Sequence, residues 1–141
     1  PKDGITWIAD LDAGRRAYQT GNPADGIEPL RRLLARNPEN VSALLALATC
    51  YLGTGRTDDA VAADRRALAI RPDDDLVHFN LANALLGTGD LDRAVEQFRL
   101  ALEAAPGDQA VHIHHNLGQT LMSQGRLDEA LDHFHEPGHI F

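Results

Sequence analysis

The chain has 141 residues and a formal net charge of −8, and 43% of its residues are hydrophobic but only 5% aromatic. This length allows one domain or one short repeat array, and an acidic surface repels phosphate backbones, so nucleic acid is not expected as a partner. No run approaches the roughly 20 apolar residues of a membrane-spanning helix, so no membrane association is expected. The single cysteine, Cys50, excludes an intramolecular disulfide.

A repeat with a step of 34 residues organises the chain. This period is typical of an array of helical hairpins, each closed by a turn glycine and ended by a proline. It favours a binding role over catalysis. The residues that keep the step are Gly21, Gly55 and Gly89, and Pro38, Pro72 and Pro106.

The apolar spacing predicts eight helices. In the second repeat, for example, Leu44, Leu47, Ala48 and Tyr51 fall at i, i+3, i+4 and i+7, on one helical face. The fourth repeat is two residues late, which predicts a longer loop near Gly107. In chain order the predicted helices cover residues 6–20, 24–36, 41–53, 58–70, 75–87, 91–104, 109–123 and 127–135.

Polar residues at the predicted helix starts indicate caps. We expect Thr57 to cap the helix that follows it, with Asp58 next to the positive end of the helix dipole. Asp90 is expected to do the same for the sixth helix. The run at 73–75, which consists of three aspartates, is interpreted as a capped helix start and not as a catalytic cluster.

These residues resemble the tetratricopeptide repeat family. That family combines a large apolar residue, a Leu-Gly or Leu-Ala pair, a turn glycine, Ala-x3-aromatic and a closing proline. The resemblance implies a right-handed all-α solenoid of four units, over about 6–39, 40–73, 74–108 and 109–136, in one domain over 1–141 with a tail at 137–141. The chain departs from the family pattern at Gly26, Asp64 and Pro137.

The first helix of each pair lines the concave groove in this family, and by resemblance the groove holds a peptide or a partner protein. Of the lining residues, only Arg15 is basic, which argues against a clamp for a peptide carboxylate. The expected lining residues are Ile8, Leu11, Arg15 and Tyr18; Ser42, Leu45, Thr49 and Leu52; Leu76, Phe79, Asn80, Asn83 and Leu86; and His112, His115, Asn116, Gln119 and Met122.

Asn80 and Asn116 occupy equivalent places in the third and fourth repeats. An amide side chain offers a donor and an acceptor, so it can pair with any peptide backbone. Their placement is similar to the asparagine ladder of the O-GlcNAc transferase repeat domain. The alternative is that they are exposed polar residues or form hydrogen bonds between helices.

Six of the seven histidines lie in the last 30 residues. Imidazoles can bind zinc or copper, and the candidate cluster is His112, His115, His133 and His135. However, His133 and His135 are two apart on a helix and do not share a face. We therefore expect no physiological metal and no other cofactor.

The main hypothesis is a non-enzymatic scaffold that binds a peptide or partner protein in its groove. Two alternatives are a targeting domain of a larger enzyme, such as a glycosyltransferase, and a self-association module. Leu127, Leu131 and Phe134 would leave an apolar end after the last repeat, which we expect to be covered by the tail, by a second copy or by sequence outside the given chain. The composition, low in lysine and rich in arginine, alanine and leucine, suggests a bacterial protein. A cytoplasmic location is expected, and the start at Pro1 suggests that the sequence is part of a longer chain.

Overall fold

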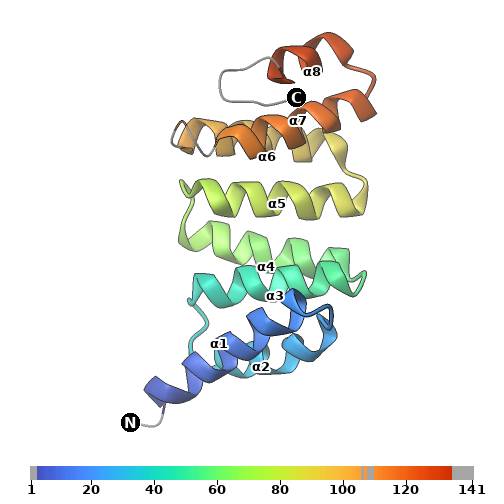
Figure 1. The fold of residues 1–141 in the computed structure, drawn as a ribbon. Helices are drawn as coiled ribbons and strands as arrows, with labels where there is room; N and C mark the ends of the chain where they lie inside the picture. Colours follow the sequence, from blue (N-terminus) through green and yellow to red (C-terminus); the bar gives the residue numbers. More distant parts are fainter. Residues whose placement is uncertain (1–2, 106, 108–109, 135–141) are drawn as a thin grey trace. The chain divides into compact units, whose positions relative to one another are not determined.

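The computed structural model describes residues 3–105, 107 and 110–134. These residues form eight α-helices and, within the same ranges, no β-strand (Figure 1). The chain divides into two compact units, Pro1–Pro72 and Asp73–Phe141, each of which contains two helical hairpins. No helix among the described residues is both long enough and apolar enough to span a bilayer.

The first unit contains two hairpins, and each helix packs most extensively against its partner in the same hairpin. In addition, α2 packs against α3, and α1 packs against α3. The helices are α1 (Asp3–Gln19), α2 (Ala24–Arg36), α3 (Val41–Gly53) and α4 (Thr57–Ile70).

The second unit repeats this plan, with α6 packed against α7 between the two hairpins. Phe98, Leu117 and Leu121 are among its fully buried side chains. The helices are α5 (Asp75–Thr88), α6 (Leu91–Ala104), α7 (Ala110–Ser123) and α8 (Leu127–Phe134).

The helix boundaries agree with those predicted from sequence to within a few residues, and the largest difference is the start of α1 at Asp3. Asp74 and Asp90 cap α5 and α6 as expected, since their carboxylates accept backbone N–H bonds. The predicted cap at Thr57 is wrong. Thr57 is the first residue of α4, the preceding residue Arg56 makes no side-chain cap bond, and its guanidinium instead pairs with Asp59 at 2.8 Å.

Small residues let the first three helices approach closely. A methyl group added at Gly26, where the family usually has alanine, would lie 2.8 Å from Cys50 Sγ and 2.9 Å from Gly14 O. A methyl group at Gly14 would overlap the Leu30 side chain. Glycine at position 26 therefore leaves room for the Cys50 side chain. The thiol of Cys50 lies 3.7 Å from Gly14 O.

Asp64 takes the place of the usual aromatic residue and is fully buried. Both carboxylate oxygens are inaccessible to solvent, and neither has a hydrogen-bond partner among the residues that the structure describes. Burial disfavours the charged form and raises the pKa of Asp64 to about 8. The side chain is consequently a neutral acid near pH 7.

The hairpin turns depend on glycine in the left-handed region. Gly21, Gly55, Gly89 and Gly125 have φ values from 78° to 86°, a region that disfavours residues with a Cβ.

We expect Gly89→Ala to lower the free energy of unfolding by about 1 kcal/mol, measured by urea denaturation. Gly107→Ala is the control, since Gly107 has open space and no such φ; equal stability of the two variants would contradict the explanation.

The buried acid predicts an unusual pH dependence. Because the folded-state pKa of Asp64 lies above the unfolded value near 4, its protonated form is favoured by folding, and stability falls as pH rises from about 4 through about 8. Between pH 5 and 7 the wild type should lose about 2 kcal/mol more than Asp64→Asn or Asp64→Leu. Parallel curves for all three proteins would show that Asp64 keeps an ordinary pKa.

Candidate functional site

The predicted groove positions lie on the first helix of each hairpin, and the structure leaves most of them accessible. Leu11 is the exception, because it is only 8% exposed and belongs to the core, so its assignment to the groove was wrong. The positions that are exposed or half-buried include Arg15, Tyr18, Leu45, Thr49, Phe79, Asn80, Asn83, His112, His115, Asn116 and Gln119.

The two units differ in how their inner helices meet. In the first unit α1 packs directly against α3. In the second unit the backbones of α5 and α7 barely approach each other over the described residues, and α6 provides the main contact between the hairpins. Two recesses lie between these helices, and together they are called the opening here.

An apolar cavity of about 180 Å³ lies in this opening, at the first turns of α5 and α7. Its wall consists of Leu76, Phe79 and Ile113, with Asp75 and His112 at the same site. The Phe79 ring is fixed by an edge-on contact with Phe98, with 5.9 Å between ring centroids. Leu76, by contrast, is 53% exposed and has no such support.

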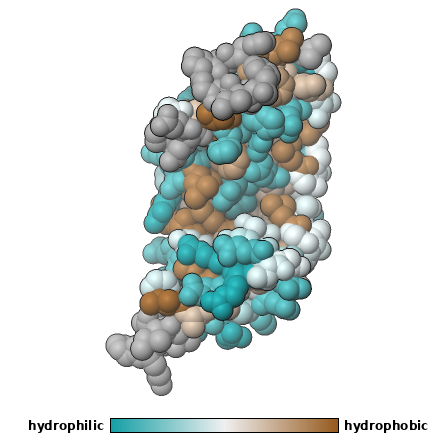
Figure 2. Space-filling model, viewed as in Figure 1, coloured by the Kyte–Doolittle hydropathy of each residue, from teal (hydrophilic) through white to brown (hydrophobic). Residues whose placement is uncertain are grey.

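Further along the same helices the opening becomes polar. A recess of about 250 Å³ is lined by Leu86, Asn116, Gln119, Thr120 and Ser123. Figure 2 likewise shows polar and apolar patches next to each other on the drawn face. The recess thus offers amide and hydroxyl groups to a ligand that also reaches the apolar cavity.

One amide pair bridges the opening. Asn116 Nδ2 donates to Asn83 Oδ1 at 3.2 Å, and Thr120 Oγ1 donates to the Asn116 carbonyl at 2.8 Å. The hydrogen bond between helices that the sequence left as an alternative for Asn116 is therefore present. This hydrogen bond uses Nδ2 of Asn116 and Oδ1 of Asn83. Oδ1 of Asn116 and Nδ2 of Asn83 remain as an acceptor and a donor for other groups.

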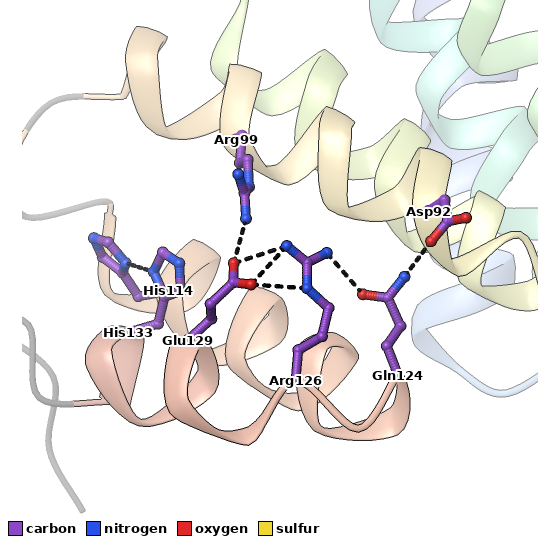
Figure 3. Close-up of polar contacts among 7 residues, drawn as sticks. All are labelled: Asp92, Arg99, His114, Gln124, Arg126, Glu129 and His133. Atoms are coloured by element: carbon purple, nitrogen blue, oxygen red, sulfur yellow. Dashed lines mark hydrogen bonds and ion pairs between the residues drawn. The ribbon is translucent and has the colours of Figure 1, made fainter.

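The histidines are arranged differently from the candidate cluster. His114, which was not in that cluster, has its Nδ1 at 2.8 Å from Nδ1 of His133, so one ring nitrogen donates and the other accepts (Figure 3). His135 lies outside the described residues. Within the described ranges no group of three or more metal-binding side chains occurs.

A polar network on the outer helices connects the two hairpins of the second unit (Figure 3). Arg99 of α6 and Arg126 of the last turn both donate to Glu129 of α8, at 2.9 and 2.8 Å, and Gln124 donates to Asp92. The hydrogen bond from Arg126 is the main reason that the pKa of Glu129 is lowered. These exposed contacts supplement the packing of α6 against α7.

The sequence analysis missed two residues of the apolar cavity, Asp75 and Ile113. Asp75 precedes Phe79 by four residues and so shares its helix face, which was a usable indication. The sequence gives Ile113 the pattern of an ordinary core residue. It lines the cavity because it lies next to the opening between the helices.

Of the three residues expected to form an apolar end after the last repeat, Leu131 is 44% exposed and Phe134 is half-buried over Gly118. The side chain of Leu127 lies outside the part that the structure describes.

The amide bridge predicts an energetic coupling. Asn83→Ala and Asn116→Ala should each lower the free energy of unfolding by about 0.5–1.5 kcal/mol, because each removes the same neutral hydrogen bond. A double-mutant cycle should then give a coupling energy of about 0.5 kcal/mol or more. Strictly additive effects in urea denaturation would mean that the bridge is not formed in solution.

Comparison with known proteins agrees with this architecture. A tetratricopeptide repeat model matches residues 11–75 and 79–136, whereas curated protein sequences give no significant match. A structure of MamA AMB-1 is 31% identical, with a TM-score of 0.70 over 89% of this chain and 67% of that chain. Pseudomonas aeruginosa PilF is 22% identical, with a TM-score of 0.84 over 95% of this chain and 60% of that one.

A Thermobaculum terrenum O-GlcNAc transferase mutant is 27% identical, with a TM-score of 0.80 over 95% of this chain but only 26% of the enzyme. The predicted all-α fold of tetratricopeptide helix-turn-helix units is confirmed. This fold supports the role of a protein-interaction scaffold. The chain belongs to the tetratricopeptide repeat family.

Proposed function

We propose that this chain is a non-enzymatic scaffold that binds an extended peptide segment of a partner protein along α5 and α7. The observation that carries the proposal is the opening between these helices, with its apolar cavity followed by a polar recess. An extended peptide presents alternating side chains and unpaired backbone groups, so it needs both kinds of surface.

The amides give the proposed site a way to bind backbone. Asn80 is half-buried on α5. Asn116 uses Nδ2 in its bond to Asn83, so its Oδ1 can still accept a hydrogen bond. Each can exchange hydrogen bonds with a peptide N–H or C=O whatever the peptide sequence. On α1 and α3, Arg15, Tyr18, Leu45 and Thr49 offer a smaller set of accessible contacts.

A second candidate function is substrate targeting within a larger enzyme. The similarity to about a quarter of an O-GlcNAc transferase favours this possibility. The peptide site would be the same, and catalysis would belong to other parts of that protein.

The proposal is tested by selecting peptides. A random peptide library displayed on phage is panned on the wild-type chain, and the affinities of selected peptides are measured by fluorescence anisotropy. Asn80→Ala combined with Asn116→Ala should weaken binding at least tenfold, because about two neutral hydrogen bonds to peptide backbone are lost.

The matched control is Gln19→Ala combined with Asn22→Ala, which removes two exposed amides at the α1–α2 turn. Both double variants must have wild-type helicity by circular dichroism. If selected peptides bind both equally well, the peptide site does not lie on the inner helices of the second unit.

A further inference from the structure

The two units differ sharply in charge. The sequence of Asp73–Phe141 contains 3 arginines, no lysine and 12 aspartates or glutamates, a formal charge of −9. The sequence of Pro1–Pro72 contains 10 lysines or arginines and 9 acids, a formal charge of +1. The net negative charge of the chain therefore belongs entirely to the unit that has the opening.

The three arginines of the second unit do not lie on its inner helices. Arg93 and Arg99 belong to α6, and Arg126 precedes α8. Each is paired with a carboxylate, Arg93 with Asp90 and the other two with Glu129. The sequences of α5 and α7 contain no lysine or arginine at all.

A carboxylate instead lies at the apolar cavity. Asp75 is half-buried in the cavity wall, one residue after Asp74, whose side chain is engaged as the cap of α5. Asp75 forms no ion pair with any residue in the described ranges. The cavity thus combines an apolar wall with an acidic rim, which lies at the N-terminal end of α5.

We propose that the ligand of this site is a basic peptide in which one large apolar side chain is flanked by lysine or arginine. The proposal rests on the proposed function and specifies its ligand. A volume of about 180 Å³ is below that of sites for drug-sized molecules and suits a single side chain. Leu76, Phe79 and Ile113 contact that side chain, and Asp75 pairs with the neighbouring cation.

The rest of the peptide runs towards the polar recess. Leu76 and Leu86 are ten helical residues apart, about 15 Å along α5, which an extended chain crosses in about five residues. Asn116 and Gln119 then bind its backbone. The surrounding charge of −9 accelerates association of a cationic segment and makes its binding dependent on salt.

The test uses three fluorescein-labelled probes of ten residues, built from Ser and Gly except at the centre. The central residues are Lys-Phe-Lys, Glu-Phe-Glu or Lys-Ser-Lys. At pH 7.5 and low salt, the wild-type chain should bind Lys-Phe-Lys at least tenfold more tightly than either other probe. Asp75→Asn should reduce the preference over Glu-Phe-Glu at least threefold.

Leu76→Ser should weaken binding of Lys-Phe-Lys at least fivefold, because it removes an exposed apolar contact without touching the core. The matched control is Leu131→Ser, a leucine of similar exposure on α8, which should leave binding unchanged. Circular dichroism and urea denaturation verify that all three variants remain folded.

Several results would overturn the ligand class. The first two are equal binding of Lys-Phe-Lys and Glu-Phe-Glu, and no binding of Lys-Phe-Lys. The third is a preference for Lys-Phe-Lys that Asp75→Asn and Leu76→Ser leave intact. The fourth is binding only after Ile140→Ser and Phe141→Ser, which would make the chain's own tail the occupant. If library-selected peptides still depend on Asn80 and Asn116, the proposed function stands and only the ligand class is wrong. If they do not, the proposed function itself fails.

Discussion

The structure depends on one constraint, that each helical hairpin can bury its apolar face only against a neighbouring hairpin. The distance between neighbours is then set by the side chains at their contact. In the first unit Gly14, Gly26 and Cys50 are small enough for α1, α2 and α3 to pack together. In the second unit α6 carries the contact between hairpins, and α5 and α7 stay apart. The opening thus exists because the hairpins of the second unit pack through α6 and not through α5.

This arrangement separates stability from recognition within the second unit. Phe98, Leu117 and Leu121 are fully buried, and the network at Glu129 lies on the outer helices. Phe79 connects the two functions, because its ring contacts Phe98 and the residue also lines the cavity. Leu76 and Asp75 contribute little to the core, so they are free to serve a ligand.

Much of the fold could be predicted from the sequence, since turn glycines, prolines and apolar spacing are local properties. Gly89 and Asp90 correctly predicted a helix end and the cap of the next helix. The predicted cap at Thr57 was wrong, because the local pattern does not distinguish a capping residue from the first residue of a helix. The site was harder to predict. The pairing of His114 with His133 and the cavity between Phe79 and Ile113 depend on distances between helices, which no spacing along the chain encodes.

The central claim is that α5 and α7 form the peptide site, and backbone amide NMR of the isotopically labelled chain tests it most directly. Titration with a library-selected peptide should shift the amide signals of Leu76, Phe79, Asn83 and Asn116, while those of Arg99 and Glu129 on the outer helices stay in place. Shifts confined to the outer helices, or to the first unit, would contradict the account.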